Sequence, residues 1–278
     1  MQVVLLAAGL GSRLGALTKD IPKALVSVAG KPLMFHALEF AARLQPVQVI
    51  VVGGYGFPLV ARALAEGQAK TPALARLPIQ LVENASFRDG NLISLLAARS
   101  RLTEGFVLLN VDHIYRSSVA KVVAPDVADV TAFIDTDRNL GADDMKVERR
   151  PDGRVRRIAK TLTKFDSGYV GMTRVPSTAL PRYWQTAEAA LAEEGRAIHV
   201  ERILGRLAES DAAPLCRDIS GHGWLEVDTA EERAAAEQTL IAAPAFESTE
   251  RFDSAVKSSS CDAWALSDSL APRKRGEG

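Results

Sequence analysis

Apolar and polar positions alternate along the first third of the chain in a way that predicts strands and helices in turn. Short runs that are nearly all apolar predict strands at residues 3–6, 47–52, 79–82 and 106–110. Between them, apolar residues at helical spacing predict helices near residues 32–43, 57–66 and 92–101. Such alternation is typical of βαβ units. We therefore expect an α/β fold with a mostly parallel, Rossmann-like sheet, helices on both faces, and ligands at the carboxyl ends of the strands.

The pattern changes after Asp112. A further strand is predicted at 127–134, and the turn residues 151–153 predict a hairpin between 145–149 and 154–159. Helices are predicted at 177–194, 200–208 and 229–241, the last with Asp228 or Thr229 as its N-cap. We assign residues 1–243 to one domain. Residues 244–278 lose periodicity and predict a disordered tail, whose three basic residues at 273–275 we interpret as solubilising rather than membrane-binding.

Composition narrows the functional classes. The chain has 278 residues, 47% of them hydrophobic, which suits one large domain with a sizeable core. Basic and acidic residues balance at 34 each, which argues against a nucleic-acid-coating surface. Cys216 and Cys261 are isolated and predict neither a disulfide framework nor a zinc site. No signal peptide or membrane span is predicted, so we expect a cytoplasmic protein, and the oligomeric state, including a homodimer, stays open.

A glycine-rich loop follows the first predicted strand. Gly9 and Gly11 allow the backbone N–H groups to face an anion, and Arg13 and Lys23 add full positive charges, which together indicate a nucleoside triphosphate. A strand-to-helix turn without a ligand would show the same two glycines. A dinucleotide fingerprint is excluded because Leu14 stands where its third glycine belongs, and a kinase-type phosphate loop is excluded because neither glycine precedes Lys.

The loop resembles that of the nucleotidyltransferase superfamily. The matched patterns are L-A-A-G-x-G-S-R-L at its start and P-K-A-L-V-x-V-x-G-K-P-L over residues 22–33. The resemblance implies a nucleotide-diphospho-sugar transferase type of fold, with a small β-hairpin and helical insertion that binds the acceptor. It implies that the base is held around Ala7, Ala8 and Gly9. It also implies that the triphosphate is held by Gly11, Ser12, Arg13 and Lys23, with Arg13 and Lys23 counted as catalytic.

Nucleotidyl transfer needs charge neutralisation and positioning rather than a covalent nucleophile, and Mg²⁺ held by one or two carboxylates supplies part of both. Asp112 follows the predicted strand 106–110, and Asp228 precedes the last predicted helix, where a plain N-cap is the alternative. In the resembled family an Asp at each place binds the metal. We therefore predict Asp112 and Asp228 as Mg²⁺ ligands, with Glu226 as an alternative acid.

A second set of polar residues lies at 83–91. Gly90 ends a predicted turn and Asn91 begins a helix, where free N–H groups suit either a simple helix cap or a contact with base or ribose. The resemblance favours nucleotide contact, because related enzymes carry a G-N or N-N pair here. Glu83, Gly90 and Asn91 are therefore predicted to be nucleotide-binding.

For the acceptor, the chain is most similar to the CTP:inositol-1-phosphate cytidylyltransferases. That similarity covers most of residues 3–240 and uses the segments 112–115, 135–138, 145–147 and 166–168. It implies that CTP and inositol 1-phosphate give CDP-inositol and pyrophosphate, without the membrane-embedded synthase fused to some relatives. Lys146 is then predicted to pair with the acceptor phosphate, and Asp144, Asp166 and Glu226 to line the acceptor site.

Other acceptors remain open. Phosphocholine, 2-aminoethylphosphonate and sugar 1-phosphates are used by enzymes with the same early motifs, although a choline site calls for several aromatic residues, and only 6% of this chain is aromatic. A different class is an inactive nucleotide-binding regulator. We favour an enzyme because the charged residues Arg13, Lys23, Asp112, Lys146 and Asp228 are all present.

Overall fold

The computed structural model describes residues 1–247, and its centre is a nine-stranded sheet. The strands run in the order β10-β9-β11-β6-β1-β4-β5, and β8 and β12 continue from β11. Strands β6, β1, β4 and β5 are parallel to one another, as the alternating pattern predicts. Their bounds are β1 Gln2–Ala7, β4 Gln48–Gly53, β5 Ile79–Glu83 and β6 Phe106–Asn110.

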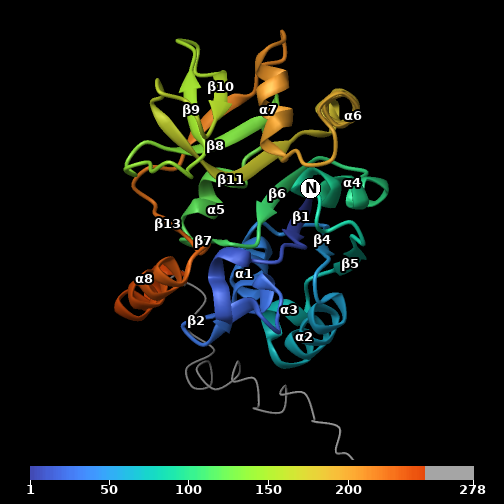
Figure 1. The fold of residues 1–278 in the computed structure, drawn as a ribbon, viewed down its shortest axis with the longest axis vertical. Helices are drawn as coiled ribbons and strands as arrows, with labels where there is room; N and C mark the ends of the chain where they lie inside the picture. Colours follow the sequence, from blue (N-terminus) through green and yellow to red (C-terminus); the bar gives the residue numbers. More distant parts are fainter. Residues whose placement is uncertain (248–278) are drawn as a thin grey trace, which may run out of the picture.

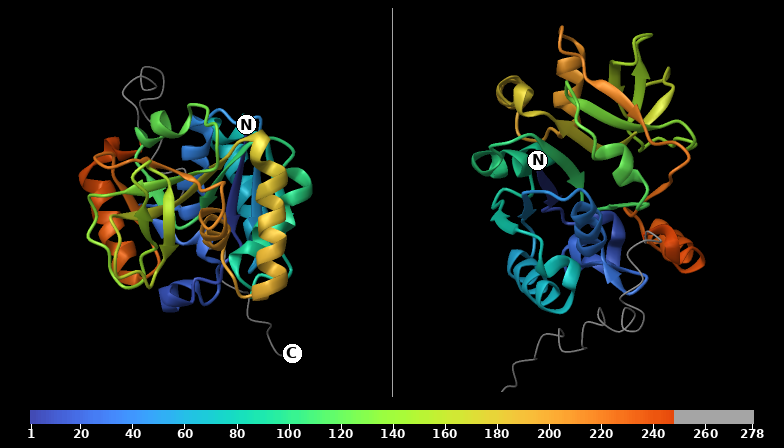
Figure 2. Two further views of the ribbon diagram at one scale, coloured as in Figure 1. Left: turned by 90° about the horizontal axis from the view of Figure 1, so that it is seen from above. Right: turned by 180° about the vertical axis from the view of Figure 1, so that it is seen from behind.

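The two faces of these strands carry separate cores because successive side chains point to opposite sides. Leu5, Val51 and Leu109 face the helices α1, α2, α3, α5 and α8, whereas Leu6 and Leu108 face α4, α6 and α7. The helices are α1 Leu33–Arg43, α2 Phe57–Lys70, α3 Pro72–Ala75, α4 Asn91–Ala98, α5 Val119–Val123, α6 Leu180–Glu194, α7 Glu201–Ala208 and α8 Ala230–Ala242. Figure 2 shows α6 and α8 on opposite sides of the molecule.

The second half of the sheet is antiparallel around β11, Ser167–Val175, which pairs with β6, β8 and β9. The predicted hairpin forms as β9, Lys146–Arg149, and β10, Val155–Ala159. We expected it to belong to a small insertion. Instead it extends the main sheet through β11, and α7 packs on β10 (Figure 1). The predicted strand at 127–134 begins later, as β8 Thr131–Asp135, which pairs in parallel with β12 Leu215–Asp218.

Short elements complete the fold. Three 3₁₀ turns are η1 Ser12–Thr18, η2 Lys23–Leu25 and η3 Arg99–Arg101, and a fourth, η4 Ser177–Ala179, leads into α6. The small strand pairs are β2 Ser27–Val28 with β3 Lys31–Pro32, and β7 His113–Tyr115 with β13 Trp224–Glu226. After β13 the chain returns to the first half, where α8 contacts β2 and η1 (Figure 1). Within residues 1–247, none of the helices combines the length and apolar character that crossing a bilayer requires.

The domain extends past its predicted end at residue 243. Residues 244–246 form the 3₁₀ turn η5, Pro244–Phe246, and Phe246 is buried. The carbonyl oxygen of Phe246 accepts a hydrogen bond from the Ser117 amide at 2.9 Å, and the Glu247 carboxylate lies 3.0 Å from the Lys31 ammonium. A buried aromatic ring and a paired carboxylate therefore hold this segment to the domain. The rest of the predicted tail, 248–278, lies outside the described residues.

Candidate active site

The glycine loop leaves β1 and leads into η1 beside Lys23. Gly11 has φ of 69°, and a β-carbon there would lie 2.8 Å from Cβ of Lys23, so the position requires glycine for both reasons. A β-carbon at Gly9 would meet no atom within 4 Å, because that side of the loop faces open space. The loop is therefore packed on Lys23 on one side and open to a ligand on the other.

Lys23 lies between two carboxylates that come from distant parts of the chain. Its side chain is 8% exposed, and its Nζ donates to Asp112 Oδ2 at 2.7 Å and also to Asp228 Oδ1. Arg13, on η1, pairs with the other oxygen of Asp228 and is 47% exposed. The four charged residues that the sequence predicts to bind the triphosphate and the metal thus form one connected group of ion pairs.

Two strand ends bring the carboxylates together. Asp112 follows β6, and Asp228 follows β13, whose partner strand β7 begins one residue after Asp112. The Val227 amide donates to the Asp112 carbonyl at 2.9 Å, which fixes the two segments side by side. The N-cap of α8 is Thr229, which forms a capping box with Glu232. The carboxylate of Asp228 is consequently not needed as a cap and faces Lys23.

The charges of this cluster favour one another's ionised forms. Burial acts to lower the pKa of Lys23, but Asp112 and Asp228 outweigh it and hold that pKa above its usual value. Burial acts to raise the pKa of Asp112. Lys23 and His113 outweigh this effect of burial and hold the pKa of Asp112 well below its usual range. His113 Nδ1 lies 2.6 Å from Asp112 Oδ1. The Asp112 carboxylate is therefore ionised and available to a cation at neutral pH.

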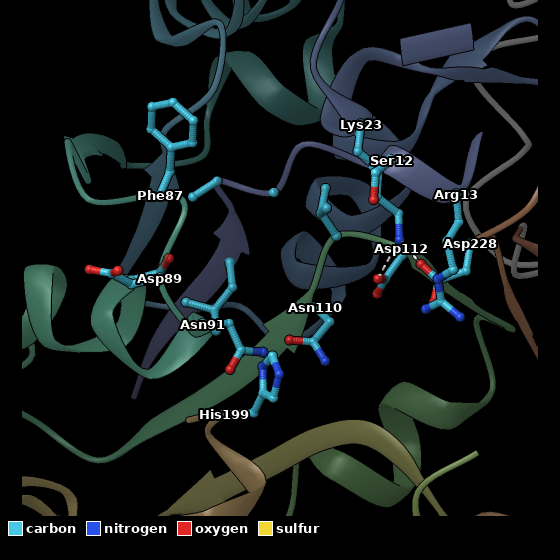
Figure 3. A pocket seen from close by; sticks show the side chains of 16 residues that line it. Ser12, Arg13, Lys23, Phe87, Asp89, Asn91, Asn110, Asp112, His199 and Asp228 are labelled. Carbon is cyan, nitrogen blue, oxygen red and sulfur yellow. Dashed lines mark hydrogen bonds and ion pairs between the residues drawn. The ribbon is translucent and has the colours of Figure 1, made fainter. Parts of the chain in front are cut away.

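The cluster forms one end of a cavity of about 340 Å³ (Figure 3). Most of the predicted nucleotide and metal residues line it: Ala8, Gly9, Gly11, Ser12, Arg13, Lys23, Asn91, Asp112 and Asp228. Figure 3 shows Phe87, Asp89 and Asn91 at the other end, away from the charged cluster. The cavity thus has an ionic end beside the glycine loop and a less charged end beside the start of α4.

Comparison with known proteins agrees with this geometry. The family model described as a MobA-like NTP transferase domain matches residues 3–198. The chain belongs to the MobA-like NTP transferase family. It is therefore a nucleotidyltransferase by family, and the match includes the glycine loop, Lys23 and Asp112 but ends before Asp228.

Curated relatives of this NTP transferase include bifunctional IPC transferases and DIPP synthases. It is 28% identical over 240 residues to a bifunctional IPC transferase and DIPP synthase of Aquifex aeolicus, a match covering 86% of this chain and 51% of the relative. The chain thus spans about half the length of the curated relatives it matches first.

Two solved structures share the fold. The inositol-1-phosphate CTP transferase from T. maritima has a TM-score of 0.71 at 17% identity, covering 86% of this chain and 96% of that one. The CTP:phosphocholine cytidylyltransferase from Streptococcus pneumoniae has a TM-score of 0.67 at 20% identity, covering 86% and 98%. The predicted fold class is confirmed.

Sequence reasoning missed several residues that line the cavity of the transferase. Asn110, Phe87, Asp89 and His199 belong to it. His199 enters because the segment before α7 crosses the start of α4: the Gly90 amide donates to the Arg196 carbonyl at 2.8 Å. A β-carbon at Gly90 would lie 1.8 Å from the Ile198 carbonyl oxygen. Gly90, predicted to contact nucleotide, therefore lies under this crossing segment and does not line the cavity.

The other residues predicted to bind the nucleotide differ in whether they line the cavity. Ala7 is buried within β1, and Glu83 is exposed at the end of β5; neither lines the cavity. Asn91 does line it, and its side-chain oxygen also accepts a hydrogen bond from the Val200 amide at 2.8 Å. The Asn91 side chain therefore joins α4 to α7 as well as facing the cavity.

The structure does not place Lys146 as we predicted. Its ammonium donates to the carbonyl oxygens of Gly141 at 2.6 Å and Lys160 at 2.9 Å, with those of Ala142 and Asp144 within 3.5 Å. An ammonium has three protons, so none is left for a substrate phosphate. The residue is 7% exposed and does not line the cavity. Lys146 instead fixes the loop before β9.

The predicted acceptor acids also have protein partners. Asp166 accepts from the backbone amide of Arg149 at 2.9 Å and from its guanidinium at 2.5 Å, and Asp144 accepts from the Gly141 amide at 2.6 Å. Glu226 is closer to the site, because it pairs in register with His113 on the strand next to Asp112. Burial raises the pKa of Glu226, and the charges of Asp112 and Asp228 add to this against the opposing charge of His113.

The donor set suits Mg²⁺. Within residues 1–247 no group of three or more His, Cys, Asp or Glu side chains is arranged to hold a metal by itself. Two carboxylates do converge on one cation, the Lys23 ammonium. Mg²⁺ is commonly bound by one or two carboxylates, with water and substrate phosphates completing the shell. Asp112 and Asp228 fit that pattern, provided that a triphosphate supplies further oxygens.

Proposed function

We propose that this transferase joins CTP to inositol 1-phosphate with Mg²⁺, giving CDP-inositol and pyrophosphate. The observation that carries the proposal is the convergence of Arg13, Lys23, Asp112 and Asp228 beside an open glycine loop at one end of the cavity. The similarity to IPC transferases and to an inositol-1-phosphate CTP transferase supports the choice of nucleotide and acceptor.

The chemistry follows from these four side chains. A phosphate oxygen of the acceptor attacks the α-phosphorus of CTP, the bond from that phosphorus to the bridging β-oxygen breaks, and pyrophosphate leaves with the bonding electrons. Arg13 and Lys23 donate to triphosphate oxygens and stabilise the charge that develops there. Asp112 and Asp228 are the residues that would hold Mg²⁺, which when bound would neutralise phosphate charge. No side chain has to act as a base, because a phosphate monoester is already ionised at neutral pH.

Phosphocholine is the less favoured acceptor for a structural reason. A quaternary ammonium is typically bound against open aromatic faces. Trp224 is stacked on His113 at 5.2 Å between ring centres, and Arg138 covers Trp224 at 4.4 Å. Tyr115 and Tyr169 are buried. The faces of Trp224, Tyr115 and Tyr169 are therefore already covered, and Phe165 is the one aromatic residue next to the predicted acceptor acids that is exposed among the described residues.

The test is release of pyrophosphate from CTP, UTP, ATP or GTP, each with inositol 1-phosphate, phosphocholine or 2-aminoethylphosphonate. We expect release only with Mg²⁺, and the highest kcat/KM with CTP and inositol 1-phosphate. Preference for another acceptor would contradict the substrate assignment while leaving nucleotidyl transfer intact. An absence of release with every pair would indicate a nucleotide-binding regulator instead.

A further inference from the structure

The acceptor needs a positive partner for its phosphate close to Asp112 and Asp228. Arg13 and Lys23 are the ligands we propose for the triphosphate, and the protons of Lys146 are taken by backbone carbonyls. A dianionic monoester that approaches two carboxylates and a triphosphate without a cation of its own would be repelled. Arg13, Lys23 and the proposed Mg²⁺ are all assigned to the triphosphate, so none of these cations is left for the acceptor phosphate.

Arg138 supplies a cation beside Glu226, two residues before Asp228, and is not itself among the residues that line the cavity. Its guanidinium lies 4.4 Å from the centre of the Trp224 ring, 3.6 Å from Glu226 and 3.8 Å from Asp144. Both carboxylate distances exceed those of hydrogen bonds. Among the described residues this guanidinium makes these contacts and no hydrogen bond, and its side chain is 30% exposed. Its N–H donors are therefore available to a ligand.

A stack of rings places Arg138 relative to the carboxylates. Trp224 is fixed by a hydrogen bond from its Nε1 to Asp135 Oδ2 at 2.7 Å, and its ring lies nearly parallel to that of His113, at 6°. His113 in turn contacts Asp112. The Arg138 guanidinium and the His113 ring thus both contact the indole ring of Trp224. Glu226, which faces Arg138, lies two residues before Asp228 on the strand that leads to it.

We propose that Arg138 binds the phosphate of the acceptor, a phosphate monoester, and orients it toward the α-phosphorus of the nucleotide. This rests on the proposed function. A planar guanidinium suits the task because it binds two phosphate oxygens in parallel while its face stays on Trp224. A lysine ammonium has neither the paired, parallel N–H donors nor the flat face of a guanidinium. The Trp224 ring and the nearby carboxylates of Glu226 and Asp144 hold the Arg138 guanidinium in position before the acceptor arrives.

Calorimetric titration of inositol 1-phosphate into the full-length protein tests this without requiring turnover. With Arg138→Gln or Arg138→Lys we expect affinity to fall about 10- to 100-fold, the size of a lost charged hydrogen-bonding partner. The affinity for methyl phosphate, which has the phosphate without the polyol, should fall by a similar factor in these variants. Equal affinity in the variants, or no binding of either phosphate by the unaltered protein, would overturn the assignment.

Kinetics separate binding from a structural effect on Trp224. In the same variants KM for the acceptor should rise while KM for CTP and the melting temperature stay near those of the unaltered protein. A matched control is Arg62→Gln, because Arg62 is a 60% exposed arginine that pairs with Glu66 on α2. A rise in KM for CTP of the same size would indicate a general disturbance and contradict the assignment. Binding of the acceptor without pyrophosphate release would refute the proposed reaction but not the role of Arg138.

Discussion

Lys23 and Lys31 are two lysines in nearly the same electrostatic setting. Lys23 contacts Asp112 and Asp228, and Lys31 contacts Glu39 at 2.7 Å and Glu247 at 3.0 Å. Their side chains are 8% and 16% exposed. In each case burial acts to lower the lysine pKa, and the two carboxylates outweigh it and raise the pKa.

The surroundings of the two lysines differ. The carboxylates of Lys23 line the cavity beside Gly9 and Ser12, where a ligand can replace the ion pairs. Glu247, by contrast, is also bonded to His36 at 2.7 Å, and this group ties the end of the described chain to α1 and β3. A buried lysine between two acids is therefore not by itself a sign of function. The adjoining open loop and cavity distinguish the Lys23 cluster.

The largest expected effect on turnover comes from substituting a carboxylate beside Lys23. Asp112→Asn should lower kcat for pyrophosphate release by at least about 10²-fold, the size typical of a lost electrostatic contact to the transition state. Glu39→Gln, the equivalent change beside Lys31, should leave kcat within about twofold. Steady-state assays at saturating CTP and Mg²⁺ measure both. Near-normal turnover in Asp112→Asn would refute the metal assignment.

The lysines themselves give the next contrast. Lys23→Ala should reduce kcat about 10²-fold through loss of a triphosphate contact. Lys31→Ala should leave kcat unchanged and lower the free energy of unfolding by about 1–3 kcal/mol, because two partly buried carboxylates lose their cation. Denaturant unfolding and pyrophosphate assays on both variants provide the comparison. The two clusters would have to be regarded as equivalent if Lys23→Ala changed stability alone.

The third contrast is a pH dependence that the Lys31 cluster confers on stability. Burial acts to raise the pKa of Glu247, but His36 and Lys31 outweigh it and lower that pKa to about 2, from 4.5. The carboxylate therefore adds stability above about pH 4.5, and this is lost as the pH falls toward about 2. Glu247→Gln should remove up to about 3 kcal/mol at neutral pH and progressively less in acid. Unfolding of both proteins from about pH 7 to about pH 3 measures the difference, and a constant difference would contradict the low pKa.

The parallel half of the fold could be predicted because its strands are continuous apolar runs and its loop motif is local. The antiparallel half was harder to predict. β11 has the sequence SGYVGMTRV, with polar residues and two glycines in a fully buried strand. Gly171 has φ of 69°, and a β-carbon there would lie 2.7 Å from His113 Nε2. The glycine that interrupts the apolar pattern of β11 is therefore required by a contact with a residue distant in sequence.

The same reason separates the predicted site residues that line the cavity from those that do not. Gly11, Lys23, Asp112 and Asp228 stand at strand ends or in a motif, where position follows from the alternating pattern. Lys146 looks equally cationic in the sequence, but the carbonyls that take its protons belong to a loop whose path no pattern reveals. His199 reaches the cavity because the segment before α7 crosses Gly90. That crossing depends on the packing of two halves of the chain.

Asp228 reaches the cleft from a part of the chain that lies beyond the family-matched residues 3–198. Its amide and that of Thr229 both donate to Glu232, at 2.8 Å and 3.0 Å, so the carboxylate is positioned by the first turn of α8. A ribosome builds the glycine loop, Lys23 and Asp112 long before it reaches this helix. In a nascent chain the glycine loop, Lys23 and Asp112 therefore exist before Asp228 does, and under the proposed mechanism the site is complete only once α8 has docked.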